Sequence, residues 1–172
     1  TTETTQNITV NATDTYGVTI TAANDCTSYC EINVTVYDSP TCNITASPDS
    51  SVCEGTDVNL TENGGDAVSW NWTTTETTQN ITVNATGTYG VTITDANDCT
   101  SYCEINVTVY DSPTCNITAS PDSSVCEGTD VNLTENGGDA VSWNWTTTET
   151  TQNITVNATG TYGVTITAAN DC

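Results

Sequence analysis

The chain has 172 residues and a formal net charge of −22, because 22 acidic residues stand against no lysine, arginine or histidine. Nucleic acids and anionic membrane surfaces bind proteins through positive charge, so the composition excludes both as expected partners. No apolar run approaches the roughly 18 residues that a membrane span needs. We therefore expect no membrane insertion of this segment.

The sequence repeats with a period of 73 residues, so that Trp70 returns as Trp143 and Cys53 returns as Cys126. A fixed period of this size is typical of arrays of small domains. We predict that residues 1–39 are the C-terminal part of one unit, that 40–112 are a complete unit, and that 113–172 lack the last strand of a unit. The chain is therefore expected to be a window on a longer polymer. Alternatively, a strand from another subunit completes each terminal fragment.

Period-two alternation of apolar and polar residues predicts strands through the complete unit. The predicted strands are residues 42–46, 57–61, 68–72, 79–84, 89–94 and 104–110, with turns at 47–49, 62–66 and 85–87. No helical periodicity competes with this pattern. The fold class is therefore all-β, with tandem Ig-like β-sandwich domains in a head-to-tail fibre. Tyr89 stands where a tyrosine corner is expected in such a sandwich.

Several motifs of the unit occur together as a set. They are Val52-Cys53-Glu54-Gly55, Trp70, Gly87-Thr88-Tyr89, and the runs 77–83 and 91–99. With these motifs the unit resembles the Ig-like/PKD-like domains strung in tandem in giant surface proteins of Bacteroidetes-type bacteria and of archaea. That resemblance implies a cell-surface stalk or adhesin.

The motif with the clearest chemistry is Asn-x-Thr, the acceptor sequence for N-glycosylation, in which x is never proline here. Its asparagines are Asn7, Asn11, Asn33, Asn43, Asn59, Asn71, Asn80, Asn84, Asn106, Asn116, Asn132, Asn144, Asn153 and Asn157.

The phase of these motifs agrees with modification. Residues i and i+2 of a strand share a face, so Asn80 and Thr82 point away from Ile81. The same alternation predicts that every motif lies on a solvent-facing side of a strand, in both sheets. The alternative is that Asn and Thr are simply the outward residues of a threonine-rich β protein.

Nine cysteines, at four per period, are typical of small disulfide-stapled domains outside the cytoplasm. A zinc cluster is disfavoured because no histidine accompanies them. The first and last strands of an Ig-like unit run side by side, which predicts a bond between Cys42 and Cys103. Two partners remain open for Cys53: Cys99 in the same unit, or Cys172 in the next.

Acidic loops offer a weak case for Ca²⁺ at a domain junction, through Asp95 and Asp98 with Asp66 or Asp57. The position of Asp95 is Ala22 and Ala168 in the other copies, so it is not a required ligand, and we expect no metal. There is no histidine, no lysine and no nucleophile motif. The chain is predicted not to be an enzyme, and to carry no cofactor other than covalent N-glycans.

These observations predict a structural segment of an extracellular, heavily N-glycosylated, disulfide-stapled fibre or cell-surface stalk. Its expected partners are copies of itself or neighbouring repeats. The alternative is an adhesin whose repeats bind a host or environmental glycan, or a protein. Such an adhesin would use the loops around Gly64-Gly65 and residues 95–99.

Overall fold

The computed structural model describes residues 3–172, and all of the regular structure in them is β-strand. The strands are β1 (Asp14–Thr21), β2 (Thr27–Val34), β3 (Ile44–Ser47), β4 (Ser51–Cys53), β5 (Val58–Glu62), β6 (Ser69–Trp72), β7 (Asn80–Val83), β8 (Gly87–Thr94), β9 (Thr100–Tyr110), β10 (Ile117–Ser120), β11 (Val131–Glu135), β12 (Ala140–Trp145), β13 (Asn153–Val156) and β14 (Val164–Ala168).

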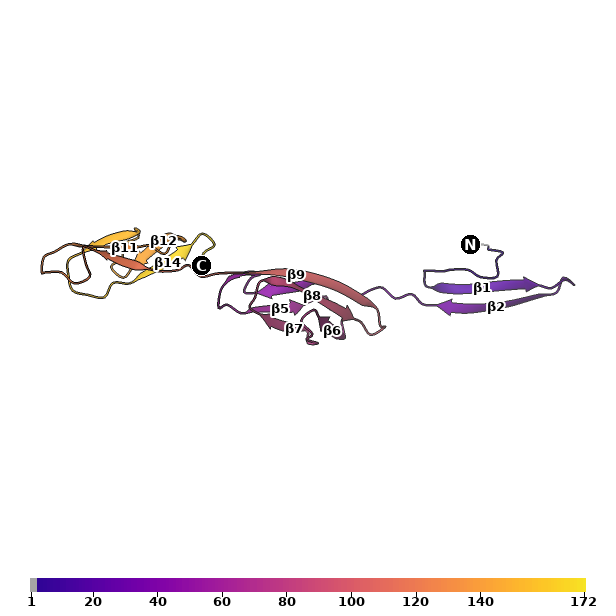
Figure 1. Ribbon diagram of the computed structural model, residues 1–172. Helices are drawn as coiled ribbons and strands as arrows, with labels where there is room; N and C mark the ends of the chain where they lie inside the picture. The colour runs from indigo at the N-terminus through magenta and orange to yellow at the C-terminus, as the bar shows by residue number, and fades with distance from the viewer. Residues whose placement is uncertain (1–2) are drawn as a thin grey trace. The chain divides into compact units, whose positions relative to one another are not determined.

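Residues 40–112 contain two sheets, with strand orders β3-β5-β7 and β4-β9-β8-β6 (Figure 1). Pairing is antiparallel between β5 and β7 and between β6 and β8, whereas β4 runs parallel to β9. The first strand is thus shared between the sheets, β3 joining one and β4 the other. This order is that of an Ig-like sandwich, in which the first, second and fifth strands oppose the third, sixth and seventh.

A tyrosine corner occurs in each of the three copies. Tyr89 donates a hydrogen bond from its hydroxyl to the backbone oxygen of Ala85, at 2.8 Å. Tyr16 and Tyr162 make the same bond four residues upstream, at 2.9 and 2.7 Å. Such a bond back to the upstream backbone is a hallmark of Ig-like sandwiches.

The core of residues 40–112 follows from the alternation along the strands. Val58 and Leu60 on β5 are fully buried, and so are Val91 and Ile93 on β8. Complete burial of such a side chain contributes about 1.5–3 kcal/mol to folding. The intervening polar residues face outward, so a single alternating pattern creates both the core and the polar surface.

The flanking residues hold fewer strands. Residues 3–39 contain one antiparallel hairpin, β1–β2. After residue 112 there are a β10-β11-β13 sheet and a β12-β14 pair. Val131, Leu133, Trp145 and Ile154 form the buried cluster of this last segment.

Two compact units can be described separately. One holds β1, β2 and β6 together with Cys42 and Cys103, and the other holds β3, β4, β7 and β10–β14 together with Cys53 and Cys172. Residues 40–112 contribute to both, and β5, β8 and β9 are divided between them.

Several predicted strand ends differ from the observed ones by one or two residues, and three further differences have a physical reason. Strand β4 was not predicted, because its three residues form a strand only through parallel pairing with residues 108–110 of β9. Strand β9 begins at Thr100, four residues before the predicted start. Glu62 was assigned to a turn, but it is the last residue of β5 and is buried.

Candidate glycosylation surface and cysteine pairs

Every asparagine of the Asn-x-Thr motifs is exposed to solvent. On β5, Asn59 is exposed between the buried Val58 and Leu60, and on β6 Asn71 is exposed beside the buried Trp72. The exposed asparagines are residues 7, 11, 33, 43, 59, 71, 80, 84, 106, 116, 132, 144, 153 and 157. Glycan transfer to a folded chain would therefore meet no buried acceptor.

The alternation predicts that all of these asparagines lie within strands, but some of them lie outside. Asn43 directly precedes β3, and Asn84 directly follows β7. The chain turns at Ala85, where the Tyr89 hydroxyl binds the backbone oxygen. The strand pairing of β7 therefore ends one residue before Asn84. The Asn84 side chain is exposed because it lies in a turn and not because it lies on a sheet face.

Motifs on neighbouring strands lie directly beside one another. Asn59 on β5 is opposite Thr82 on β7, and Thr61 is opposite Asn80. The acceptor asparagine of each motif thus faces the threonine of the other, and the two asparagines are diagonal neighbours at about 7–8 Å. The pairing recurs between β11 and β13, where Asn132 is opposite Thr155.

Hydrogen bonds hold some of the acceptor side chains in place. The Thr88 hydroxyl donates to Asn106 Oδ1 at 2.6 Å, and the Thr15 hydroxyl makes the equivalent bond to Asn33 Oδ1. These bonds involve the side-chain carbonyl oxygen of each asparagine. The amide nitrogen, to which a glycan attaches, takes no part in them. Asn157 differs, because its amide nitrogen donates to Asp130 Oδ1 at 3.5 Å.

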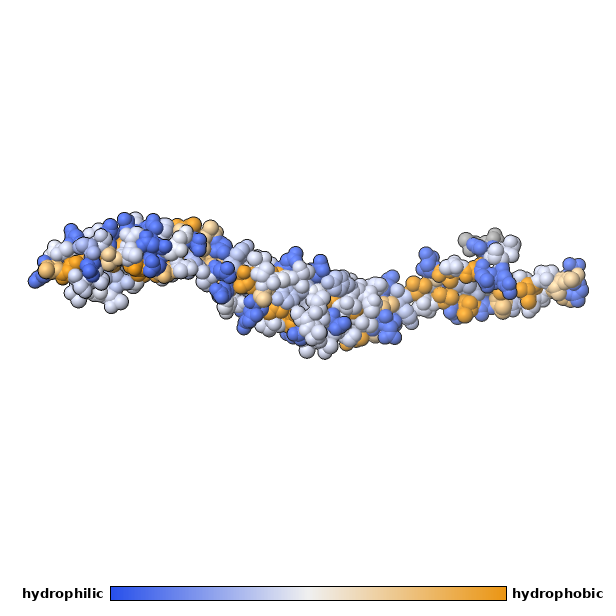
Figure 2. All heavy atoms as spheres, viewed as in Figure 1, coloured by the Kyte–Doolittle hydropathy of each residue, from blue (hydrophilic) through white to orange (hydrophobic). Residues whose placement is uncertain are grey.

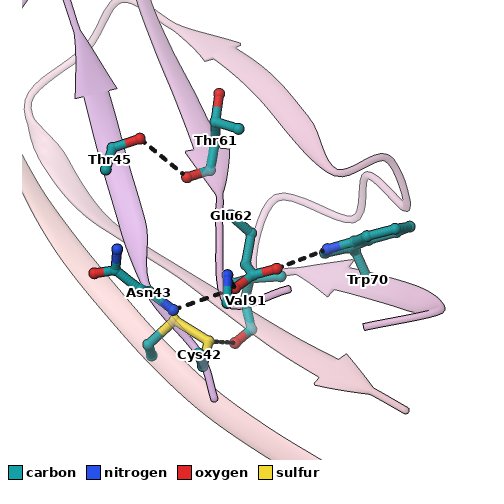
Figure 3. The surroundings of a disulfide bond; sticks show 9 residues. Cys42, Asn43, Thr45, Thr61, Glu62, Trp70 and Val91 are labelled. Atoms are coloured by element: carbon teal, nitrogen blue, oxygen red, sulfur yellow. Dashed lines mark hydrogen bonds between the residues drawn. A yellow bond between two sulfur atoms is a disulfide. The ribbon is translucent and has the colours of Figure 1, made fainter. Parts of the chain in front are cut away.

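A buried carboxylate at the end of β5 was not found by sequence reasoning. Glu62 Oε1 accepts hydrogen bonds from the backbone N–H of Asn43 at 3.2 Å and of Gly64 at 2.6 Å (Figure 3). Its Oε2 accepts from the indole N–H of Trp70 at 3.2 Å. The sequence pattern could have revealed this burial. Glu62 lies two residues after Leu60 and four after Val58, so the alternation along the strand places its side chain on the same inward face.

Glu135 repeats this arrangement at the end of β11. The N–H of Asn116 is the largest influence on its pKa and lowers it below the ordinary value for a glutamate. Burial acts in the opposite direction, and the N–H of Gly137 and the indole of Trp143 add to the lowering. The carboxylate is thus stabilised in its charged form by donors from three segments.

The chain directly after β5 requires a glycine at position 64. A Cβ there would collide with the backbone oxygen of Thr41. The next residue, Gly65, has a φ of +97°, a conformation that side chains strongly disfavour. The Gly64-Gly65 pair therefore lets the chain pass close to the first strand while Gly64 donates its N–H to Glu62.

Two disulfides are formed, between Cys42 and Cys103 and between Cys53 and Cys172. Of the two partners that the sequence left open for Cys53, the bond is to Cys172, and Cys99 is a half-buried free thiol. In Figure 3 the sulfur of Cys42 lies beside the backbone oxygen of Val91, at 3.9 Å. A bonded sulfur has no hydrogen to donate, so this is a packing contact.

A family model described as "Protein of unknown function (DUF642)" matches residues 1–88. The chain belongs to the DUF642 family. No curated protein matches this DUF642 chain.

Among solved structures, murine CEACAM1b is similar at 17% identity, over 61% of this chain and 72% of that one, with a TM-score of 0.37. The human OSCAR ligand-binding domain is similar at 13% identity, over 78% and 86% of the two chains, with a TM-score of 0.34. The Ig-like assignment itself rests on the strand order and the tyrosine corners.

The acidic loop of this DUF642 chain has a structural role at Asp95. Its Oδ1 accepts the N–H groups of Asn97 and Cys99, at 2.8 and 2.9 Å, and so holds a tight turn. Where Ala22 replaces it, the turn keeps its backbone hydrogen bond to Cys26. No group of three metal-ligating side chains occurs within residues 3–172, and no helix there has the length and apolarity to cross a membrane.

Proposed function

We propose that the chain is a structural segment of an extracellular fibre or cell-surface stalk, N-glycosylated on its outward faces and linked by disulfides. Its role is mechanical and protective, and catalysis forms no part of it. The resemblance of the repeat to the domains of giant prokaryotic surface proteins supports this role.

The observation that carries the proposal is the exposure of every Asn-x-Thr asparagine, which on β5, β6 and β7 stands beside a buried apolar residue. A sheet face of Asn and Thr, with no lysine at its edges, is poorly protected against pairing with other edges. Glycans on those faces would block such pairing and shield the backbone from proteases.

The disulfides support a location outside the cytoplasm, because such bonds persist in oxidising compartments. The Cys53–Cys172 bond joins a residue of the complete unit to the last residue of the following segment. A bond of this kind would limit the extension of the chain under load, which suits a stalk.

The mass of this 172-residue segment, isolated from the natural protein, tests the proposal. The glycosylated chain should be heavier than the 18.0 kDa polypeptide and should fall to that mass after treatment with a peptide-N-glycosidase. Each released glycan converts its asparagine to aspartate, so peptide mapping identifies the occupied positions. A natural segment with the mass of the bare polypeptide would overturn the proposal.

A second candidate, an adhesin, is favoured by one observation. Val68 is 60% exposed beside the Gly64-Gly65 turn, and its counterpart Val141 is 59% exposed. An exposed apolar side chain directly before β6 in one copy and near the start of β12 in the next suits contact with a ligand. Binding to a glycan array that is lost in Val68→Asp, Val141→Asp and kept in Thr88→Asp would support this candidate, and absence of any binding would remove it.

A further inference from the structure

The sequence Asn-Gly occurs twice in the chain, at Asn63-Gly64 and at Asn136-Gly137. Each pair directly follows a buried glutamate that ends a strand, Glu62 on β5 and Glu135 on β11. Neither asparagine belongs to an Asn-x-Thr motif. The glycosylation proposed above therefore gives these two pairs no role.

An Asn-Gly pair is a point of spontaneous chemical change. The backbone nitrogen of the glycine loses its proton and attacks the side-chain Cγ of the asparagine. A C–N bond forms, the Cγ–Nδ2 bond breaks, and ammonia leaves with the proton, so that a five-membered succinimide results. Water then opens the ring to give aspartate or isoaspartate. Glycine favours the attack because it has no Cβ to hinder it.

Solvent exposure does not protect either pair. Asn63 and Asn136 are exposed, and the glycines that follow them are half-buried. Polar residues make up most of the surface seen in Figure 2. Water can therefore reach both asparagines, and any protection must come from the way in which the turn is held.

The nitrogen that would attack is held by the buried carboxylate. Gly64 donates its N–H to Glu62 Oε1 at 2.6 Å, and Gly137 makes the same bond to Glu135 Oε1. Loss of that proton would place a negative nitrogen beside a negative carboxylate, and like charges repel strongly where water is partly excluded. The hydrogen bond must also break before the nitrogen can turn toward the asparagine side chain.

The carboxylate could instead act as a base and take the proton from the glycine. The N–H donors around Glu135 oppose this role, because they stabilise its charged form. The N–H of Asn116 is the largest cause of the lowered pKa of Glu135, and the N–H of Gly137 and the indole of Trp143 add to it. A carboxylate held in this way is a weak base.

The side chain that would be attacked is held as well. Asn136 Nδ2 donates to the Thr118 hydroxyl at 2.7 Å and to the backbone oxygen of Thr134 at 3.1 Å. Its backbone N–H donates to the backbone oxygen of Asn116 at 2.7 Å. Turning Cγ toward the glycine nitrogen would break the two side-chain bonds, so both reacting groups are kept from each other.

We propose that Glu62 and Glu135 protect the Asn63-Gly64 and Asn136-Gly137 pairs from conversion to aspartate and isoaspartate, by keeping the glycine nitrogen protonated and in place. Isoaspartate would insert an extra carbon into the backbone directly after β5 or β11. The inference goes beyond the proposed function and does not depend on glycosylation.

The test follows the mass of each pair during incubation of the full chain, produced without glycans, at pH 7.4 and 37 °C. Conversion adds one mass unit, and cleavage at glutamate followed by fragmentation locates it. In the unmodified chain the peptides 63–76 and 136–149 are identical. Glu62→Ala removes one cleavage site, so peptide 55–76 then reports on Asn63 and peptide 136–149 reports on Asn136.

In Glu62→Ala, Asn63 should convert at least about tenfold faster than Asn136 in the same molecule, since a bond to a charged acceptor is lost. Glu135→Ala should reverse the order, with peptide 128–149 converting faster than peptide 63–76. Glu62→Gln keeps an acceptor without the charge, and its rate at Asn63 should lie between the two. In concentrated urea both pairs of the unmodified chain should convert fast, because the turns are open.

A destabilised control separates protection by the carboxylate from simple opening of the fold. Trp72→Phe removes a buried indole whose N–H donates to the backbone oxygen of Thr78, and it leaves Glu62 in place. The substitution also gives peptide 63–76 a mass of its own. Urea unfolding measures the stability of each variant, and Asn63 should stay slow in Trp72→Phe.

Equal rates at the two pairs in Glu62→Ala would overturn the proposal. A slower rate at Asn63 in that variant would also overturn it and would make the carboxylate a base for the reaction. Equal acceleration in Trp72→Phe would assign the protection to the fold alone. Because these chains carry no glycans, every such outcome leaves the proposed glycoprotein role to the mass measurement.

Discussion

Asn59 on β5 lies directly opposite Thr82 on β7, so two acceptor motifs occupy one pair of strands with their asparagines diagonal to each other. This relationship places two candidate glycosylation sites side by side on the outer face of the β3-β5-β7 sheet. It also allows each motif to be removed separately from the other.

Asn80→Gln should remove the glycan at residue 80 and leave the one at Asn59. Because Asn80 is exposed, the free energy of unfolding of the unglycosylated chain should change by less than about 0.5 kcal/mol. Intact mass and glycopeptide mapping measure the first effect, and urea unfolding measures the second. A shift beyond that range would mean that the side chain has a packing role.

Glu62→Gln should destabilise residues 40–112 by about 1–3 kcal/mol, because an amide group replaces one of two acceptor oxygens that receive three N–H donors. Scanning calorimetry measures the change. Glu54→Gln, at an exposed position of the same unit, is the matched control and should be close to neutral. If the two substitutions lowered the stability by the same amount, Glu62 would have no special role.

The lowered pKa of Glu135 predicts an acid-dependent loss of stability after residue 112. A carboxyl whose pKa is lower in the folded state contributes its full stabilisation above the unfolded value of about 4.3, and loses it as the pH falls through the folded value. Tryptophan fluorescence during unfolding, measured at a series of pH values, should show this loss. Glu135→Gln should flatten the dependence, and Glu127→Gln should leave it intact.

Cys99 should react with iodoacetamide more slowly than Cys26 at neutral pH. Burial, followed by the nearby charges of Asp95, Asp98 and Asp38, raises the pKa of Cys99, and the thiolate is the reactive form. Cys26 is exposed and has Ala22 where Cys99 has Asp95. Timed alkylation with peptide mapping measures both rates in one molecule.

Asp95→Ala should bring the rate at Cys99 toward the rate at Cys26, since it copies the sequence of the first repeat. An unchanged rate would assign the protection of Cys99 to burial and to the charges of Asp98 and Asp38. Equal rates in the unmodified chain would contradict the prediction.

Local alternation was sufficient to predict the main strands and the exposure of the acceptor asparagines within them. Val58 and Leu60 point inward and Asn59 outward because a strand has a period of two, which any short window of sequence reveals. The tyrosine corner at Tyr89 was likewise predicted, since its hydrogen bond reaches only four residues upstream.

What local pattern could not supply was anything that depends on distant segments. Strand β4 exists because Val52 meets Val109, and Glu62 is tolerated in the core because Asn43 and Trp70 bring donors to it. A window of sequence around Glu62 shows only an acidic residue before two glycines, which is typical of a turn.

The sequence by itself determined the repeat, the all-β class and which strand residues face the solvent, because these depend on composition and on a period of two. Only the tertiary structure decided that Cys53 bonds Cys172 rather than Cys99. It also decided that β8 pairs with β6 and β9, and that β14 pairs with β12. Both outcomes depend on which distant segments approach each other, and identical local sequences can then have different neighbours.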